Sequence, residues 1–316
     1  MSLPLVKNPV LVIVGPTSSG KSRLAFELAK LTGGEIISAD SRQIFRELDI
    51  GSAKPSPVEL QEVRHHFIDE KNIGEPFTAG HFSIDAHRRI IEILERGKPA
   101  IVAGGSTLYL QGLLEGFAEL PEGNPEIRAR LQEEMKMSGR ESLYEKLLLL
   151  DPEHAATLDP TKTQRLLRSL EIIETTGKRV TDLLAMGRKR QDGLRFSTLG
   201  LSMHRQQLYD RINRRTDSMI EAGLADEAEK LYNKYFPLLV DRKTQALRSV
   251  GYQELFDYFE GRTGFSEAVA LIKQHTRNYA KRQLTFFNNT LSVNWTAAPE
   301  NESDFSRLLE HLSGKL

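Results

Sequence analysis

The feature that most constrains this chain is a short segment near its start, in which glycines, a lysine and a serine stand at fixed spacing. Residues 15–22 read Gly-Pro-Thr-Ser-Ser-Gly-Lys-Ser and satisfy the pattern G-x-x-x-x-G-K-[ST] at every fixed position. An apolar run over residues 10–14 comes directly before this segment, and a helical pattern follows over residues 22–31. Strand, glycine-rich turn and helix in this order predict a loop whose backbone N–H groups surround phosphate oxygens.

Each residue type in this loop has a chemical reason. Glycine lets the backbone bend so that successive N–H groups point inward, and the following helix adds the positive end of its dipole. Lys21 supplies a full positive charge to terminal phosphates, and the Ser22 hydroxyl suits Mg²⁺. A glycine turn without a ligand is the alternative, which the strand and helix on either side disfavour. The loop alone does not specify which phosphate compound binds.

The first third of the chain alternates short apolar runs with helical patterns. Such runs are typical of buried parallel strands joined by helices. The expected strands are residues 10–14, 35–40, 66–69 and 100–103, with helices at 22–31 and 78–96. We therefore predict an α/β fold with a P-loop NTPase-like parallel sheet as its core.

Strand signals vanish after residue 116, and helical patterns take their place. The expected helices there are residues 127–137, 142–150 and 163–176, the last with Asp159 as its cap and Pro160 in its first turn. A strand-like run returns at 195–201. The pattern predicts an all-helical insertion, residues 116–194, within a core domain of residues 1–115 and 195–316. Helices are expected again at 204–221, 225–235, 252–260 and 266–287, then a strand at 291–295 and a polar tail.

An acid follows the second apolar run. Ligands of parallel sheets bind at the carboxyl ends of strands, so Asp40 is placed to act as a general base or to approach a metal. Its alternative role is a cap for the segment that follows. The run at 100–103 ends in glycine, where an ATP-hydrolysing enzyme would usually carry an acid for Mg²⁺, although Asp69 could fill that role. The loop is therefore interpreted as holding a diphosphate that leaves, rather than a nucleotide fuel.

Charge is balanced overall, with 43 Lys and Arg against 43 Asp and Glu, so nucleic-acid binding must come from local patches. One stripe of cations is typical of a solvated helix face, but several favour a phosphate-backbone partner. The stripes are Arg165 with Arg168, Arg211 with Arg215, residues 188–190, and Lys273, Arg277 and Lys281 followed by Arg282. Alternatively, Arg211 or Arg215 reaches the substrate diphosphate.

Composition also bears on the compartment. The chain has no cysteine, which excludes disulfides and fits a reducing cytosol. Residues 1–9 lack a signal-peptide pattern, and no apolar run is long enough to span a membrane. We expect a cytoplasmic protein with no membrane partner.

Seven segments, in this order, resemble the tRNA dimethylallyltransferases (isopentenyl-diphosphate:tRNA transferases). The segments are 15–22, 38–44 (Ser-Ala-Asp-Ser-Arg-Gln-Ile), 49–55 (Asp-Ile-Gly-Ser-Ala-Lys-Pro), Gly104-Gly105 with Leu108-Tyr109, 164–168 (Gln-Arg-Leu-Leu-Arg), 250–252 (Val-Gly-Tyr) and 280–283 (Ala-Lys-Arg-Gln). The resemblance spans roughly residues 10–290. Many families share the phosphate loop, whereas the second and third segments are far more specific.

The resemblance implies transfer of a dimethylallyl group from dimethylallyl diphosphate to N6 of the adenine just 3′ of the anticodon in tRNA. It implies a two-domain enzyme with a channel through the core, which the flipped base and the diphosphate enter from opposite ends. The implied cofactor is Mg²⁺, the implied partner is the tRNA anticodon stem-loop, and we expect a monomer.

Site residues follow from the same resemblance. The implied catalytic residues are Asp40, Lys21 and Arg211, the last preferred over Arg215 for stabilising the departing diphosphate. Diphosphate would be held by Gly15, Thr17, Ser18, Ser19, Gly20, Lys21 and Ser22. Metal would lie near Ser22 and Asp40. tRNA would contact Asp40, Ser41, Arg42, Gln43, Ser106, Arg128, Gln164, Arg165, Leu166, Leu167, Arg168 and Arg282.

The chain departs from the family pattern in two places. Ser106 stands where the family usually has threonine, which preserves a hydroxyl. Phe286 and Asn288 replace a tryptophan and an arginine, which removes one basic contact at the end of that helix.

Three other functions compete with this interpretation. They are a P-loop small-molecule kinase, a prenyltransferase acting on free adenine nucleotides, and a nucleotide-gated RNA-binding module without turnover.

Overall fold

The computed structural model describes residues 9–240 and 246–316, so the predicted lack of a signal segment falls almost wholly outside the described residues. The chain divides into two compact units. The core unit comprises residues 1–114 and 191–316, and the insertion unit comprises residues 115–190. The core unit carries the six strands that the described residues form.

The sheet is parallel throughout and has the order β3-β2-β4-β1-β5-β6. Its strands are β1 (Val10–Val14), β2 (Glu35–Ala39), β3 (His65–His66), β4 (Ala100–Gly104), β5 (Phe196–Ser202) and β6 (Asn294–Ala297). The central position of β1, between β4 and β5, brings the loop after it to the middle of the carboxyl edge. This arrangement confirms the predicted α/β fold with a parallel sheet.

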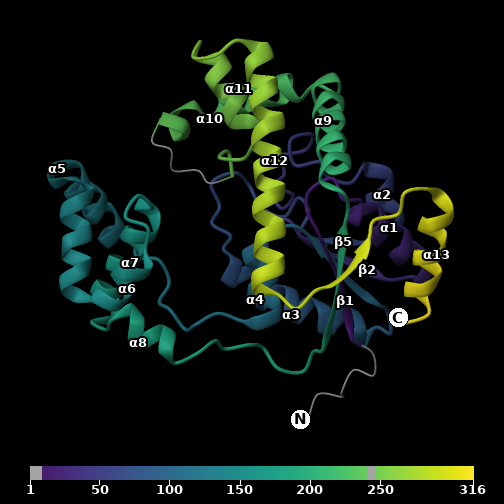
Figure 1. The fold of residues 1–316 in the computed structure, drawn as a ribbon, viewed down its shortest axis with the longest axis horizontal. Helices are drawn as coiled ribbons and strands as arrows, with labels where there is room; N and C mark the ends of the chain where they lie inside the picture. Colours follow the sequence, from purple (N-terminus) through teal and green to yellow (C-terminus); the bar gives the residue numbers. More distant parts are fainter. Residues whose placement is uncertain (1–8, 241–245) are drawn as a thin grey trace. The chain divides into compact units, whose positions relative to one another are not determined.

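Alternate side chains of the strands pack into different layers of helices. Leu11 and Ile13 of β1 belong to a cluster that includes Leu24 of α1 (Lys21–Thr32) and Phe305 of α13 (Glu302–Ser313). Val12 faces the other way, toward α3 (Ala79–Glu95) and α4 (Thr107–Glu115). Because successive strand residues point to opposite faces, the sheet is buried on both sides between helices (Figure 1).

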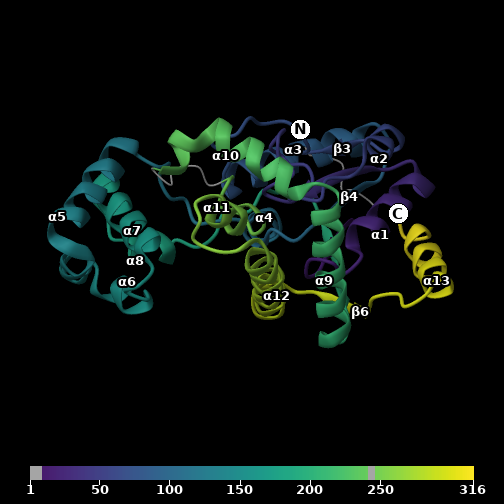
Figure 2. The same cartoon turned by 90° about the horizontal axis from the view of Figure 1, so that it is seen from above.

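A second group of helices belongs to the same unit. The group comprises α9 (Arg205–Glu221), α10 (Leu224–Val240), α11 (Tyr252–Phe259) and α12 (Phe265–Thr290). Each of these helices packs on the next one in the sequence, and α12 also packs on α9 (Figure 2). The short α2 (Pro57–Glu62) follows β2. Within residues 9–240 and 246–316, the helices are too short or too polar for any of them to cross a bilayer.

The insertion unit consists of helices around its own apolar core. They are α5 (Pro125–Leu150), α6 (Pro152–Thr157), α7 (Thr163–Thr176) and α8 (Val180–Ala185). Sequence predicted two helices where α5 stands, and Gly139 interrupts that helix with a φ of 82°. An antiparallel bridge between Phe117 and Lys189 joins the two ends of the unit.

Several predicted elements need correction. β3 ends at His66 because Phe67 and Asp69 adopt positive φ, which ends extended pairing. β6 begins at Asn294 rather than Leu291, since Leu291 packs in the core at the end of α12. Asp159 is not the cap of α7, whose N-cap is Lys162.

The polar tail expected after the last strand contains a helix that was not predicted, since residues 302–313 form α13. Phe305 and Leu312 lie on its buried side, and Asn301 caps its start by accepting a hydrogen bond from the Asp304 N–H. Leu308 and Leu309 pack against the same cluster, so four apolar side chains at helical spacing cover one face of α13.

A buried carboxylate at the start of β2 generates a stability prediction. Glu35 is 1% exposed, and its oxygens lie 2.8 Å from His66 Nε2, 2.7 Å from an Arg96 nitrogen and 3.3 Å from Lys98 Nζ. Burial alone would raise the pKa of Glu35, but these hydrogen bonds lower it to about 2. The carboxylate therefore stabilises the fold above its ordinary pKa of 4.5, and that contribution is lost as pH falls toward 2.

We expect Glu35→Gln to lower the free energy of unfolding by about 3 kcal/mol at pH 7. The difference from the parent should shrink as pH falls below 4.5 in urea-unfolding titrations. The control is Glu92→Gln, which removes an exposed pair with Arg88 and should change stability by less than about 0.5 kcal/mol. A pH-independent loss from Glu35→Gln would contradict this account.

Candidate active site

The loop between β1 and α1 has the backbone that its glycines predict. Gly20 has a φ of 92° and ends the loop as the N-cap of α1, and a Cβ on Gly15 would lie 2.9 Å from the Ser19 hydroxyl oxygen. The hydroxyl oxygens of Ser18 and Ser19 are buried, and neither has a hydrogen-bond partner among the described residues. Buried hydroxyls without partners are uncommon, and here they stand in a loop suited to phosphate oxygens.

Lys21 lies in a cationic environment. Its ammonium donates a hydrogen bond to the Pro16 carbonyl oxygen at 3.1 Å. Burial, followed by the charge of Arg215, lowers the pKa of Lys21 to about 8, while the charge of Asp40 opposes this lowering. Burial also lowers the pKa of Arg215, again against the effect of Asp40. Two partly buried cations whose charges act on each other favour an anionic ligand near them.

The glycine pair after β4 is explained by close backbone contacts. A Cβ on Gly104 would lie 2.1 Å from the Ala39 carbonyl oxygen, and a Cβ on Gly105 would lie 2.3 Å from Gln283 Nε2. Gln283 is 2% exposed; its Oε1 accepts the Thr17 N–H at 2.9 Å and its Nε2 donates to the Gly105 carbonyl oxygen at 2.8 Å. Gln283 thus ties the phosphate loop to the end of β4. It was not among the predicted site residues, although the segment 280–283 contained it.

Asp40 caps the turn that follows β2. Its Oδ1 accepts the N–H of Arg42 at 2.8 Å and of Gln43 at 3.4 Å, so the capping role considered from sequence is real. The N–H of Ser41 donates to the Ser106 hydroxyl at 2.8 Å, which joins the ends of β2 and β4. The bonds to the turn use one carboxylate oxygen, so a capping Asp40 still presents an acceptor at the carboxyl edge.

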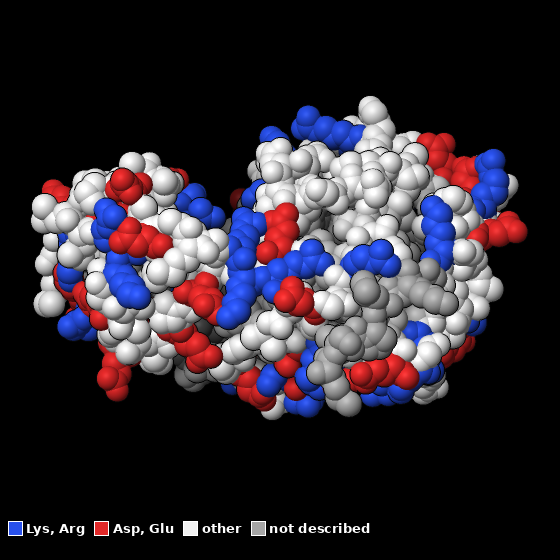
Figure 3. All heavy atoms as spheres, turned by 90° about the horizontal axis from the view of Figure 1, so that it is seen from below, with Lys and Arg blue, Asp and Glu red and all other residues white. Residues whose placement is uncertain are grey.

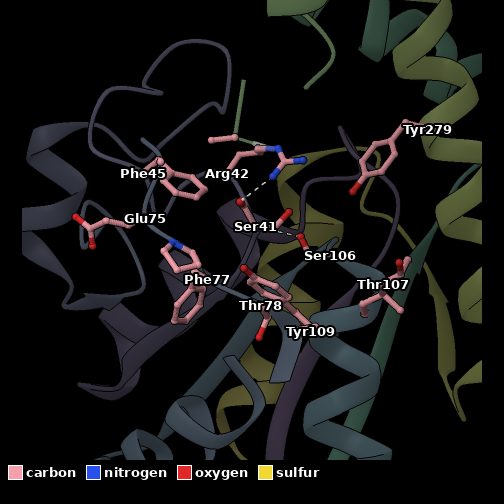
Figure 4. A pocket seen from close by; sticks show the side chains of 15 residues that line it. Ser41, Arg42, Phe45, Glu75, Phe77, Thr78, Ser106, Thr107, Tyr109 and Tyr279 are labelled. Atoms are coloured by element: carbon pink, nitrogen blue, oxygen red, sulfur yellow. Dashed lines mark hydrogen bonds between the residues drawn. The ribbon is translucent and has the colours of Figure 1, made fainter. Parts of the chain in front are cut away.

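A cavity of about 720 Å³ opens beside this turn. Figure 4 shows its wall of aromatic and polar side chains, and the labelled ones include Ser41, Arg42, Phe45, Phe77, Ser106, Tyr109 and Tyr279. The Tyr109 ring stacks on Phe82 with centroids 4.3 Å apart. Loss of water around the Tyr279 hydroxyl, followed by the Asp40 charge, raises the pKa of Tyr279 to about 12. Aromatic walls with polar edges suit a planar heterocycle.

The two candidate arginines of α9 occupy different places. The Arg211 guanidinium lies 4.0 Å from where a Cβ of Gly20 would be, and Arg211 lines a small pocket together with Ser19 and Gly20 of the loop. Arg215 is the one that acts on Lys21 and responds to Asp40. Asp69, the other acid considered for a metal, is engaged in an ion pair with Lys54.

Arg282 lies on α12, where it lines a groove of about 590 Å³ together with Lys281 and Phe286. Its guanidinium carbon lies 5.8 Å from the Tyr279 ring centroid. Cation, aromatic ring and amide side chains share this face, which is a composition suited to nucleic acid.

The insertion unit gathers several of the predicted tRNA contacts around Glu171. This carboxylate is 0% exposed and forms ion pairs with Arg128 and Arg168, each at 3.3 Å. Arg128, on α5, also donates to Gln164 of α7 at 2.8 Å. Arg165 lies exposed on α7. Sequence reasoning missed Glu171, because nothing local marks a glutamate as buried.

Leu166 and Leu167 require a correction. Their side chains are 1% and 0% exposed and belong to the apolar core of the insertion unit. They therefore cannot offer side-chain contacts to RNA, and the contact candidates in this segment reduce to Gln164, Arg165 and Arg168.

Surface charge is mixed rather than segregated. In Figure 3, Lys and Arg side chains are interspersed with Asp and Glu over one face of the core unit. Anion binding therefore depends on local arrangements such as the phosphate loop and the cluster around Glu171.

These features define a P-loop-like enzyme core. The phosphate loop follows the central strand β1, and Asp40 follows β2, which is separated from β1 by β4. An aromatic cavity lies beside the turn after Asp40. The sequence profile of the IPP transferase family matches residues 43–290. The chain belongs to this family, that of the tRNA dimethylallyltransferases.

Similar proteins agree with this assignment. A tRNA dimethylallyltransferase of Pelodictyon phaeoclathratiforme is 64% identical over 309 residues, which cover 97% of each chain. One from Chlorobium limicola is 60% identical over 292 residues, or 92% of each chain.

Solved structures give the same result. The full-length tRNA isopentenylpyrophosphate transferase of Bacillus halodurans aligns with a TM-score of 0.69 at 36% identity, covering 98% of this chain and 97% of that one. A eukaryotic dimethylallyltransferase acting on tRNA aligns with a TM-score of 0.79 at 25% identity, covering 93% and 75%.

The support of the loop by Gln283 generates a prediction. Gln283→Leu keeps the side-chain volume but removes the acceptor of the Thr17 N–H and the shorter of two hydrogen bonds to the Gly105 carbonyl oxygen. We expect about tenfold weaker binding of inorganic diphosphate in calorimetric titrations. Gln274→Leu, at an exposed position of the same helix, is the control. Equal affinity in both variants would contradict a role for Gln283 in holding the loop.

Proposed function

We propose that this protein transfers a dimethylallyl group from dimethylallyl diphosphate to N6 of the adenine just 3′ of the anticodon in tRNA, with release of diphosphate. The observation that supports this best is the closeness of Asp40 to Lys21 and Arg215, since its charge offsets the lowering of both their pKa values. The cations that would bind the diphosphate and the carboxylate that would accept the proton thus lie together, beside a cavity suited to an adenine ring. Relatives named tRNA dimethylallyltransferase support the same reaction.

The kinase alternative is not favoured. β4 ends in Gly104 and Gly105, whose close contacts with Ala39 and Gln283 leave no room for an acidic side chain. Asp69, the remaining acid considered for a nucleotide-bound metal, pairs with Lys54.

The reaction follows from these positions. The Lys21 ammonium, the Arg215 guanidinium and the loop N–H groups stabilise negative charge as the bond between the allylic carbon and the diphosphate oxygen breaks. The adenine N6 forms a new bond to that carbon, and the free Asp40 oxygen accepts the proton that N6 loses. Arg215 takes the role that sequence assigned preferentially to Arg211.

Mg²⁺ is part of the proposal. Ser22, in the first turn of α1, and Asp40 offer the hard oxygen donors that this ion prefers. No cluster of three acidic or histidine side chains within the described ranges could enclose a metal, so the ion would rely on diphosphate oxygens and water as well. When bound, it would supply further positive charge to the leaving group.

tRNA contacts are proposed in both units. In the core unit they involve the turn after Asp40, with Ser41, Arg42 and Gln43, together with Ser106 and Arg282. In the insertion unit they involve Arg128, Gln164, Arg165 and Arg168. A solved relative described as acting on tRNA supports this assignment.

Incubation with labelled dimethylallyl diphosphate, Mg²⁺ and unmodified tRNA tests the function. We expect label in tRNA, at an adenosine located by nuclease digestion and mass spectrometry. Parallel reactions with AMP as acceptor, and with labelled ATP as donor, should give no labelled product. Label in AMP would support the nucleotide prenyltransferase, and phosphorylated product would support the kinase.

Asp40→Asn separates the base from the cap, because the asparagine oxygen can still accept the Arg42 N–H. We expect the rate of transfer to fall by about 10²–10⁴-fold, the usual contribution of a general base. The tRNA dissociation constant, measured by filter binding, should stay within about twofold. Asp40→Ala should lose transfer and loosen the turn as well. Near-normal turnover of Asp40→Asn would remove Asp40 from the mechanism.

Glu171→Gln tests the cluster of the insertion unit. Loss of this negative charge would by itself strengthen binding of an anionic RNA, whereas loss of the arginine arrangement would weaken it. We expect the arrangement to dominate, with about tenfold weaker tRNA binding. The control is Glu133→Gln, an exposed partner of Lys136. Tighter binding by Glu171→Gln would contradict the orienting role.

A further inference from the structure

Two segments singled out in the sequence, residues 49–55 and 250–252, have no role in the site described so far. They meet at one carboxylate, Glu227 of α10. Its Oε2 accepts the N–H groups of Asp49 at 3.2 Å and Ile50 at 2.8 Å. Its Oε1 accepts the Gly51 N–H at 3.0 Å and the Tyr252 hydroxyl at 2.6 Å. Three successive amides form a concavity suited to an anion, and this side chain fills it.

Gly51 and Tyr252 are needed together for this contact. A Cβ on Gly51 would lie 2.4 Å from Tyr252 Cζ, so the ring packs directly on the loop backbone. Tyr252 is 0% exposed, and burial raises the pKa of its hydroxyl far above the usual range, so the hydroxyl remains a donor. Glu227 therefore binds a rigid surface made by loop and ring together.

The same loop reaches the active-site turn through Gln43. The Nε2 of Gln43 donates to the carbonyl oxygens of Ala53 at 3.0 Å and Ser52 at 3.4 Å, and its Oε1 accepts the Ser38 hydroxyl at 2.9 Å. The Gln43 N–H in turn donates to Asp40 Oδ1 at 3.4 Å. A continuous set of hydrogen bonds thus runs from Glu227, through residues 49–53 and Gln43, to the carboxylate of Asp40.

We propose that Glu227 is a positioning residue for the transfer reaction, which fixes the loop at residues 49–53 so that Gln43 holds the Asp40 turn in its reactive geometry. This inference rests on the proposed function. Its physical basis is that Asp40 and the acceptor amine must lie in contact geometry, where a small displacement sharply lowers the rate. Donor binding is a property of the phosphate loop, on other residues, so Glu227 acts on turnover rather than on the donor KM.

Single-turnover rates at saturating substrates, together with rates measured over a range of donor concentrations, test the proposal. Glu227→Ala should lower the rate of transfer about tenfold to hundredfold, with the donor KM changed by less than about twofold. Glu227→Gln keeps one acceptor oxygen and should recover part of the rate. Glu229→Ala, at an exposed position of the same helix, is the matched control and should act like the parent. A donor KM that rises as much as the rate falls would overturn the positioning role.

A double-mutant cycle with Gln43→Ala measures whether the two losses of rate are additive. General destabilisation of the protein would not make them non-additive. If Glu227 acts through Gln43, adding Glu227→Ala to Gln43→Ala should cause little further loss, whereas two independent losses that multiply would overturn the proposal. Circular dichroism establishes that each variant is folded. If Glu227→Ala does not fold, Tyr252→Phe replaces it, because it removes one donor and keeps the ring on Gly51, and the same non-additivity is required.

The proposed function can fail separately. If the parent protein does not transfer label to tRNA, the proposed reaction is wrong. If the parent is active and Glu227→Ala is equally active, the reaction stands and the positioning role is wrong.

Discussion

The proposed active site depends on two half-buried cations, the Lys21 ammonium and the Arg215 guanidinium, whose charges act on each other. Burial lowers the pKa of both, and their mutual repulsion lowers that of Lys21 further. Asp40 opposes these effects from the end of β2. Three distant parts of the chain thus create a site where an anion is favoured and the Asp40 carboxylate is near. A departing diphosphate and an amine losing its proton are the pair of events that this arrangement suits.

The surrounding structure keeps this arrangement in register. Gly104 and Gly105 allow β4 to approach Ala39 and Gln283, and Gln283 in turn holds the Thr17 N–H of the phosphate loop. Glu227 accepts hydrogen bonds from the loop at residues 49–51, and Gln43 connects this loop to the turn that carries Asp40. Amide and carboxylate side chains that bond to backbone groups therefore do the positioning, while Lys21, Arg215 and one oxygen of Asp40 are left for substrates.

Local patterns made part of this predictable. The phosphate loop, the parallel strands and Asp40 follow from fixed spacing and apolar periodicity, which act within about ten residues. The contact of Gln283 with Thr17, between residues 266 positions apart, depends on tertiary packing, as do the partners of Glu227 and Glu171. α13 was missed although Phe305, Leu308, Leu309 and Leu312 form an apolar stripe at helical spacing, because the stripe is short and its packing partner α1 lies far away in the sequence.

Phosphorus NMR of the reaction products tests the central claim most directly, because it follows the group that the phosphate loop is proposed to hold. With dimethylallyl diphosphate, Mg²⁺, tRNA and ATP all present, the account predicts that inorganic diphosphate appears in step with prenylated tRNA while ATP stays intact. Consumption of ATP in step with product, or an unchanged allylic diphosphate in the presence of tRNA, would contradict it.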